Sequence, residues 1–346
     1  MPTHVRRVSV APLVLLLVAA VASSLLTPPP VAAQAKPVEI RLSFIAPPPN
    51  DMMPLFFQHD FFKQSLLKEY GKKYTVSFLR VAGSPGAATA MAAGELDIAT
   101  LSFPVAAQTI LKKAVPGGIS IIMSHWNDAV PGFYSDTLYV LNDSPIKTFK
   151  DLRGKKVAIN EFGSFIDVKI RIMLLNHGLD PLKDLTMVEI PFPAIGPAIR
   201  EKRVDTGTLA VPFNAIEENK GGVRPVAELV EGLGPTESIP IAGRNEFLKK
   251  NREAVRAFLA DYVAALQWAI EPPNREKAVD FMAAMLKSPR QNLELFATRK
   301  DHWRDPQARV QVDRLQKPID AMLKLGLIKE KLDIAPFIDL SYLPSR

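Results

Sequence analysis

The sequence contains no cysteine in 346 residues. Disulfide bonds, thiol nucleophiles and cysteine-ligated metals are therefore excluded. Stability has to come from a hydrophobic core, and a composition of 47% hydrophobic and 23% charged residues is that of an ordinary globular protein. A chain of this length normally divides into two lobes, because a single core stops growing at about 250–300 residues.

The common catalytic motifs are missing as well. The chain has no Gly-x-Ser-x-Gly turn, no Gly-Lys-Ser or Gly-Lys-Thr phosphate loop and no Gly-x-Gly-x-x-Gly. The acidic pair Glu217-Glu218 falls on an expected exposed helix and is interpreted as solvated. No pair of histidines has the His-x-x-x-His spacing of a metal site. The histidines are His4, His59, His125, His177 and His302. We therefore expect no catalytic residues, no metal and no cofactor.

Positive charge is modest and dispersed. The net charge is +7, of which Arg6 and Arg7 contribute two near the amino terminus. The remaining cations stand singly on expected helix faces, as Arg252, Arg256 and Lys277 do, whereas nucleic-acid binding needs them clustered with aromatics. We expect no nucleic-acid partner, although a weak positive field would help to draw in an anionic solute.

The only long apolar run lies at the start of the chain. Arg6 and Arg7 precede the apolar run Val10–Leu26, and the small-x-small sequence Ala33-Gln34-Ala35 follows. This pattern is typical of a secretory signal peptide over residues 1–35, with cleavage after Ala33 as an alternative. An uncleaved membrane anchor is the other interpretation, which the three prolines after the run disfavour. Since no cysteine follows for lipid attachment, we expect a free, soluble protein in the periplasm.

Strands and helices alternate through residues 148–213. The apolar run 157–159 suits a buried strand, Ser164 and Asp167 have a capping-box spacing before a helix, and Gly178 ends that helix. A second strand over 187–190, a helix over 195–202 and a third strand over 208–211 follow. Alternation at this spacing predicts a parallel sheet with right-handed crossovers.

The amino-terminal part shows the same alternation. Residues 38–44 alternate apolar and polar as a half-buried strand, a helix is expected over 51–70, and a strand over 74–78 follows. Next come a Gly-Ser turn, an alanine-rich helix and the sequence Gly94-Glu95-Leu96-Asp97 before a third strand. Beyond residue 246 the pattern is helical, with amphipathic stretches over 251–270, 276–286 and 306–325.

The order of these segments resembles a known family. KTFKDLRGKKVAIN (147–160), HGLDP (177–181), VEIPFP (188–193) and REKRVDTGTLAVPF (200–213) are similar to the second lobe of ABC-transporter solute-binding proteins of the nitrate, sulfonate and taurine type. This group belongs to the superfamily that resembles thiamine-pyrimidine-precursor-binding proteins. The Gly-Ser turn, alanine-rich helix and Gly-Glu-x-Asp resemble the first lobe, so the resemblance covers both.

The resemblance implies an α/β fold of the type II periplasmic binding proteins. Each of two lobes would hold a mostly parallel central sheet flanked by helices, with two hinge crossings near Tyr139 and Ile239. Lobe 1 would comprise residues 36–139 and 241–346, and lobe 2 residues 140–240. The implied function is capture of a small molecule by a monomer and its delivery to an ABC-transporter permease in the inner membrane.

Candidate ligand-binding residues follow from the rule that ligands bind beyond the carboxyl ends of parallel strands, near helix N-termini. Aromatic residues at strand ends would supply flat apolar walls. The candidates are Phe44, Ser84, Pro85, Gly86, Ser102, Trp126, Phe162, Gly163, Ser164, Phe192 and Phe213. Several have an equally good structural interpretation: Ser84 and Ser164 as helix caps, and the aromatics as core.

The ligand expected from the sequence is a small organic sulfonate or carboxylate, aromatic or aliphatic. Helix N-termini after Gly83 and Gly163 would together favour an anionic group, with Arg80 or His125 as charge partners. Glu161 argues the other way, since a carboxylate facing the cleft would favour an amine or a protonated heterocycle. Two other functions remain open: an enzyme on the same fold related to thiamine-pyrimidine synthesis, and a periplasmic ligand-sensing subunit.

Overall fold

The computed structural model describes residues 1–3, 36–45, 48–230 and 233–345. Residues 1–36 and 37–346 are separate units, and the fold described below is that of the second. The apolar run 10–26 and the cleavage site after Ala35 lie outside the described residues, so the signal peptide stays a prediction. Within the described ranges, no helix is long and apolar enough to cross a membrane.

Two five-stranded sheets organise the second unit. The first has the order β2-β1-β3-β10-β4 and the second the order β7-β6-β8-β5-β9. The strands of the first sheet are β1 (Val38–Phe44), β2 (Tyr74–Arg80), β3 (Ile98–Thr100), β4 (Ile119–Asp128) and β10 (Thr236–Arg244). Those of the second are β5 (Thr137–Leu141), β6 (Lys156–Ile159), β7 (Thr186–Glu189), β8 (Thr206–Thr208) and β9 (Val223–Glu228). We call each sheet with its helices lobe 1 and lobe 2.

Each sheet is mixed, with one strand running against the others. In lobe 1, β10 is antiparallel to both β3 and β4, while β1 pairs in parallel with β2 and β3. In lobe 2, β5 is antiparallel to both β8 and β9, while β6 pairs in parallel with β7 and β8. In each lobe the reversed strand is the first one after the chain crosses over from the other lobe, and the other strands of the sheet share one direction, so the expected mostly parallel sheets are confirmed.

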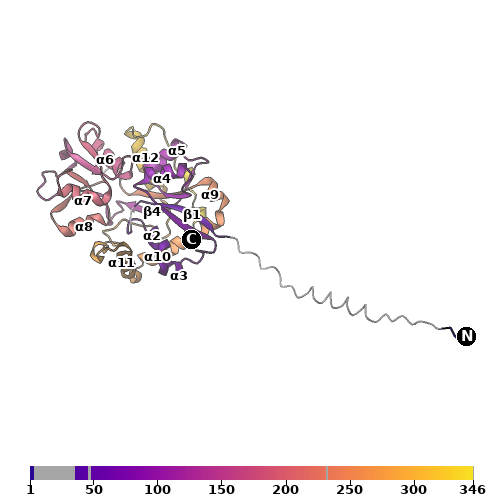
Figure 1. The fold of residues 1–346 in the computed structure, drawn as a ribbon. Helices are drawn as coiled ribbons and strands as arrows, with labels where there is room; N and C mark the ends of the chain where they lie inside the picture. Colours follow the sequence, from indigo (N-terminus) through magenta and orange to yellow (C-terminus); the bar gives the residue numbers. More distant parts are fainter. Residues whose placement is uncertain (4–35, 46–47, 231–232, 346) are drawn as a thin grey trace. The chain divides into compact units, whose positions relative to one another are not determined.

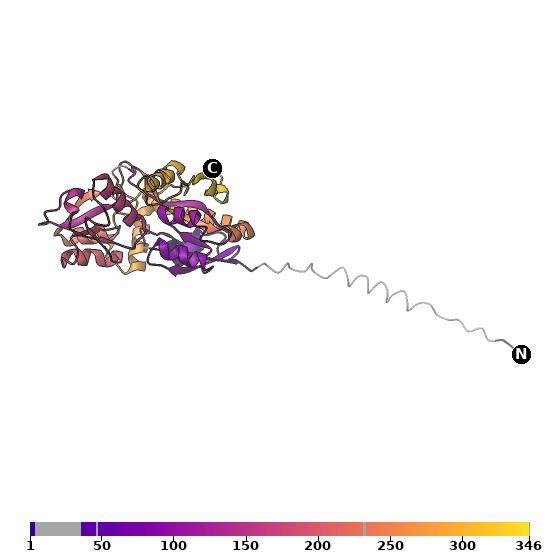
Figure 2. The ribbon, with the colours of Figure 1, turned by 90° about the horizontal axis from the view of Figure 1, so that it is seen from above.

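Helices cover both sheets (Figures 1 and 2). In Figure 1, α6, α7 and α8 gather around the second sheet, and α4, α5, α9 and α10 lie beside the first. The helices are α2 (Met53–Gln58), α3 (Asp60–Ser65), α4 (Ser84–Ala92), α5 (Phe103–Leu111), α6 (Phe165–Asn176), α7 (Phe192–Arg200), α8 (Phe213–Lys220), α9 (Asn245–Lys250), α10 (Arg252–Ile270), α11 (Pro272–Leu286) and α12 (Val312–Lys324). This is the two-lobe α/β architecture expected from the sequence.

The sequence patterns explain these elements locally. Alternation in β1 buries Ile40 and Leu42, while Arg41 on the opposite face donates two hydrogen bonds, of 2.8 and 2.6 Å, to the carboxylate of Asp97. The Asp97 of the Gly-Glu-x-Asp sequence therefore ties β1 to β3. It also accepts the backbone N–H of Arg41 at 3.0 Å, so its role is structural.

Some sequence-based expectations are wrong in detail. The helix expected over 51–70 is two helices, because the backbone of His59 is extended between them and its side-chain Nδ1 accepts the N–H of Phe61. The strand expected over 208–211 is β8, which spans Thr206–Thr208 instead. The strand β9 was not predicted. Glu217, expected in solvent, is buried and accepts hydrogen bonds from Arg200 and Lys220.

The expected lobe boundaries, after Tyr139 and after Pro240, fall inside β5 and β10. β5 pairs entirely within the second sheet and β10 entirely within the first. We therefore propose that the two crossings are the segments just before these strands, 129–136 and 229–235.

Candidate functional site

A small cavity, called here the central cavity, lies where the two lobes meet. Lobe 1 contributes residues that follow β1 or end β3, together with parts of β4, β10 and the start of α4, and lobe 2 contributes residues after β6 and at the starts of α6 and α7. The lining residues are Ile45, Asn50, Asp51, Ser84, Thr100, His125, Trp126, Asn160, Ser164, Phe165, Phe192 and Ile239. The cavity is thus built at the carboxyl ends of parallel strands of both sheets, as the rule for open α/β sheets requires.

The space inside is limited. The central cavity holds about 30 Å³, which is room for one or two water molecules. A second hollow of about 410 Å³, called here the outer groove, shares Ile45, Asn160 and Phe192 with it. Arg80 and Glu189 bring charges of opposite sign to the outer groove. An organic solute would therefore need the lobes to part, or would extend from the cavity into this groove.

The structure brings four of the candidate residues to the central cavity and one more to its edge. Ser84, Trp126, Ser164 and Phe192 line the cavity, and Phe213 lines the outer groove together with Phe192. The two hydroxyls are already engaged, since Ser84 Oγ accepts the N–H of Ser102 at 2.8 Å. Ser164 Oγ caps α6 by accepting from Asp167 N at 3.3 Å, and it donates to Asn160 Oδ1 at 2.9 Å.

The remaining candidates lie away from the lining of both hollows. The ring of Phe44 packs edge-on against Phe78 with centroids 5.8 Å apart. The side chain of Phe162 is 49% exposed on the surface. The others outside the lining are Pro85, Gly86, Ser102 and Gly163. These residues do not line either hollow. Location at a strand end was therefore not enough to distinguish the lining residues from their neighbours in the sequence.

Glu161 of lobe 2 reaches across to the N-terminus of α4 in lobe 1. A Cβ placed on Gly83, the N-cap of α4, would lie 1.9 Å from Glu161 Oε2, so the carboxylate occupies the space that a side chain there would fill. The N–H of Gly86 donates to this carboxylate. Burial, and then the negative charge of Glu189, raise the pKa of Glu161, while the hydrogen bond from Gly86 opposes the rise. The chain's own carboxylate therefore holds the helix N-terminus that was expected to bind an anion.

The second expected anion site is also occupied by side chains of the chain. Asp167 Oδ2 accepts the N–H of Gly163 at 2.8 Å, and Glu189 Oε2 accepts that of Phe162 at 3.0 Å. Together with the cap from Ser164, these bonds use N–H groups at the start of α6 that a ligand would need. A carboxylate of the chain therefore lies at each helix N-terminus where the sequence-based expectation placed an anion.

Three buried polar residues run from the central cavity into lobe 1. Asp51 Oδ1 lies 3.4 Å from His125 Nε2, and His125 Nδ1 lies 3.2 Å from the hydroxyl of Tyr262. Burial raises the pKa of Tyr262, so its hydroxyl keeps its proton. Asp51 is the one carboxylate among the lining residues, and the ring of His125 stands between it and Tyr262.

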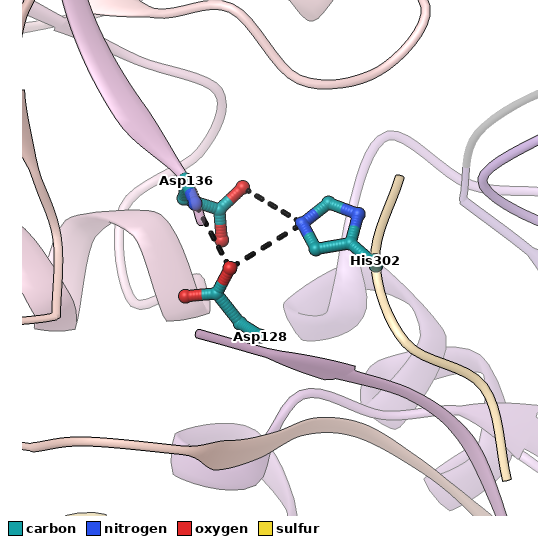
Figure 3. A group of neighbouring side chains, drawn as sticks. All are labelled: Asp128, Asp136 and His302. Carbon is teal, nitrogen blue, oxygen red and sulfur yellow. Dashed lines mark hydrogen bonds and ion pairs between the residues drawn. The ribbon is translucent and has the colours of Figure 1, made fainter. Parts of the chain in front are cut away.

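A buried ionic cluster lies beside the aromatic wall of the cavity, at the first crossing. Asp128 ends β4, Asp136 precedes β5 and His302 is in the segment before α12 (Figure 3). Lys169, in α6, completes the cluster. We call these four residues the hinge cluster. Lys169 Nζ bonds both carboxylates, at 3.2 Å to Asp136 and closely to Asp128, and His302 Nε2 lies 3.3 Å from Asp136 and 3.5 Å from Asp128.

The charges of the hinge cluster balance. Burial lowers the pKa of His302, but attraction to Asp136 and hydrogen bonds to both carboxylates outweigh it and raise the pKa to about 9. Burial likewise disfavours the charged form of Asp128, yet Lys169 and His302 lower its pKa to about 2. Atoms of Asp128, Asp136 and His302 lie within 4.8 Å of one another, as metal ligands would. Lys169 already supplies the cation there, so a divalent ion does not fit.

Comparisons with known proteins agree with this architecture. Residues 134–276 match the family model described as NMT1/THI5 like. This part of the chain, 143 of the 346 residues, is similar to that family. No curated protein shows a significant sequence match to the chain.

Several solved structures share the fold of this chain at low sequence identity. The alkanesulfonate-binding protein SsuA from Xanthomonas axonopodis pv. citri bound to MOPS superposes with a TM-score of 0.69 at 18% identity, covering 88% of this chain and 99% of that one. The periplasmic nitrate-binding protein NrtA from Synechocystis PCC 6803 gives a TM-score of 0.67 at 17% identity, covering 88% and 87%. The desulfurization enzyme DSZB gives 0.59 at 14%, covering 88% and 97%. The fold is thus that of type II periplasmic binding proteins.

Sequence reasoning missed several residues that line the central cavity. Asn50 and Asp51 follow the proline run after β1, Thr100 ends β3 and Asn160 follows β6. All four stand at the carboxyl ends of parallel strands, which is the position that predicted the other candidates. Applying the same rule to polar residues, as well as to glycines and aromatics, would have found them.

Proposed function

We propose that this protein is the solute-binding component of an ABC importer and that it takes up a small organic solute between its lobes in the periplasm. The observation that carries the proposal is the central cavity, which residues at strand ends of both sheets line together. The fold is shared with sulfonate- and nitrate-binding proteins, which supports a binding role. The partner that this role requires is a permease in the inner membrane.

Motion at the crossings would admit the solute. Binding sites for small organic molecules usually occupy about 300–1,000 Å³, far more than the central cavity of about 30 Å³. The short segment 129–136, which joins β4 of the first sheet to β5 of the second, is where a few backbone torsions would help to part the lobes. A monomer that opens and closes in this way would need no further subunit to form its site.

An organic anion was the sequence-based expectation for the solute, and the sulfonate- and nitrate-binding proteins of the same fold would agree with it. The two helix N-termini that supported this expectation are both held by acceptors of the chain, Glu161 at one and Asp167 at the other. We therefore propose the binding role without assuming an anionic solute.

The test is to identify the solute and to follow the closure. Protein purified from the periplasm is denatured, the released small molecules are identified by mass spectrometry, and the identified compound is added back to ligand-free protein. We expect saturable binding and a smaller radius of gyration in solution scattering. No released compound and no binding from a broad metabolite panel would contradict the proposal.

Two alternatives give different results in the same experiment. An enzyme is favoured by the buried pair His125 and Asp51 in the cavity and by the similarity in fold to DSZB. An enzyme would return a chemically altered solute, whereas a binding protein returns it unchanged. A sensing subunit would bind and close as well, but it would not stimulate ATP hydrolysis by a reconstituted importer.

A further inference from the structure

Two buried hydrogen-bond acceptors in the lining of the central cavity have no partner among the described residues, and the same holds for His125 Nε2. Asn50 Nδ2 donates to the carbonyl of Val211 at 2.9 Å, which leaves Asn50 Oδ1 unpartnered. Asp51 Oδ1 accepts from Met53 N at 3.2 Å, and Asp51 Oδ2 is unpartnered although the residue is only 3% exposed. A buried acceptor without a donor is destabilising, and an N–H donor of a bound molecule would satisfy both oxygens.

No lysine or arginine is among the residues that line the central cavity. Asp51 and His125 are the ionisable residues of the lining, and His125 Nε2 lies 3.4 Å from Asp51 Oδ1, whereas Asp51 Oδ2 is unpartnered. Lys169 lies 5.8 Å from the ring centroid of Phe165, behind the cavity wall, and is fully paired within the hinge cluster. Asp51 is therefore the carboxylate that a cationic solute would meet in the lining.

Glu161 adds a second carboxylate at the seam between the lobes. It neighbours the lining residue Asn160, and its Oε2 lies at the position of a Cβ on Gly83, next to the lining residue Ser84. Glu161 Oε2 is buried and has no hydrogen-bond partner. An anionic group placed at the N-terminus of α4 would meet this carboxylate, whereas a cationic nitrogen or an N–H donor would be attracted to it.

We infer that the central cavity selects solutes that carry a cationic nitrogen or several N–H donors, such as amines and amidines, and rejects anions of the same size. This inference rests on the proposed solute-binding function. In it, Asp51 and Asn50 accept hydrogen bonds from the solute. Glu161 sets specificity by occupying the N-terminus of α4, so that no anion can use it.

The experiment compares probes that share a body and differ in charge. Binding of benzamidine, benzoate, benzenesulfonate and benzyl alcohol, and of butylamine, butyrate and butanesulfonate, is measured by calorimetry and thermal shift on the full-length mature chain. We expect the cationic probes to bind and the anions to be weaker by about tenfold or more, because each 1.4 kcal/mol changes a dissociation constant tenfold. The outcome that overturns the inference is tighter binding of the anions.

Two variants assign the effect to residues. In Asp51→Asn, cationic probes should weaken about ten- to hundredfold, the ratio expected when a hydrogen bond to a charged group is lost. In Glu161→Gln, cationic probes should weaken and anionic probes should strengthen, because the carboxylate is replaced by a neutral group of the same shape. Glu330→Gln, on the surface away from the cavity, is the matched control and should change neither.

Failure of the inference is distinguishable from failure of the proposed function. If anions bind and Glu161→Gln leaves them unchanged, the charge selectivity is wrong while the binding role stands. If no probe and no metabolite of either charge binds to the wild-type chain, the binding role itself is contradicted and the inference falls with it.

Discussion

The indole ring of Trp126 stacks on the imidazole of His302, with ring centroids 4.0 Å apart and planes inclined by 28°. Trp126 lines the central cavity and His302 belongs to the hinge cluster, so one layer of aromatic rings separates the two. On the far side, His302 bonds to Asp136 at the first crossing. A change in the position of Trp126 would therefore reach the crossing through a single stacked contact.

Replacing Lys169 by methionine should destabilise the protein strongly. Lys169 is fully buried and is the partner of both Asp128 and Asp136. Removing one partner of a buried ion pair leaves an uncompensated charge, which costs about 3–5 kcal/mol of unfolding free energy. Urea denaturation at pH 7 measures this loss. The control is Lys183→Met, whose pair with Asp180 is exposed and should contribute less than about 1 kcal/mol. Similar losses of unfolding free energy in both variants would contradict the role of Lys169 as a buried ion-pair partner.

Stability should fall as the pH rises from 6.5 to 9, partly because of His302. Its pKa is raised in the folded protein, from the ordinary 6.5 to about 9, mainly by Asp136 against the effect of burial. A raised pKa of this kind stabilises the fold fully below 6.5, and the contribution is lost as the pH passes 9. The unfolding free energy of His302→Asn should have a smaller slope over this range. An unchanged slope would show that His302 is not charged in the fold.

Glu237 should make the same pH dependence steeper. Burial raises its pKa to about 8, although hydrogen bonds from Ser124 and Asn127 oppose the rise. The unfolded chain loses this proton near pH 4.5 and the folded protein near 8, so stability falls as the pH rises between these values. At pH 9, Glu237→Gln should exceed the wild type by on the order of 1–4 kcal/mol. At pH 5 the gain should be absent, and a gain of equal size there would contradict the protonated state.

Changing Gly83 to alanine should displace Glu161 without unfolding the chain. The new Cβ would meet Glu161 Oε2 at 1.9 Å, and the backbone at Gly83 is extended, so alanine is otherwise tolerated there. We expect the ligand-free variant to have a larger radius of gyration, because a contact between the lobes is lost. Gly86→Ala is the control in the same helix, since its Cβ meets only Val81 at 3.8 Å. It should raise stability by about 0.5–1 kcal/mol and leave the radius unchanged.

Much of the architecture was predictable because its signals are local. The capping-box spacing of Ser164 and Asp167 predicted the start of α6, and the alternation around Ile40 and Leu42 predicted β1. The failures were of another kind. The break at His59 depends on an imidazole nitrogen capping the next turn, and the burial of Glu217 depends on Arg200, which comes from a different helix. Neither partner can be chosen from spacing along the chain.

The candidate site was predictable only in outline. Position at strand ends led to Ser84, Trp126, Ser164 and Phe192, all of which line the central cavity. The same rule could not tell that Glu161 would cross to the opposite lobe, because that contact depends on how the lobes are docked. An anionic ligand was expected because the N-terminus of α4 was assumed to be free to bind it. The contact of Glu161 with that N-terminus changes this interpretation.

The two sheets differ in how they can be completed during synthesis. Every strand of the second sheet comes from one continuous stretch, residues 137–228, whereas the first sheet needs β10, which begins at Thr236. Until β10 emerges, the edge of β3 that it covers stays open, and an open edge is a site for mispairing. The sheet of lobe 1, whose first strands are synthesised before lobe 2, is therefore completed only after lobe 2. Folding of lobe 1 should be slow and dependent on distant pairing, and truncation before residue 236 should leave lobe 2 intact while lobe 1 aggregates.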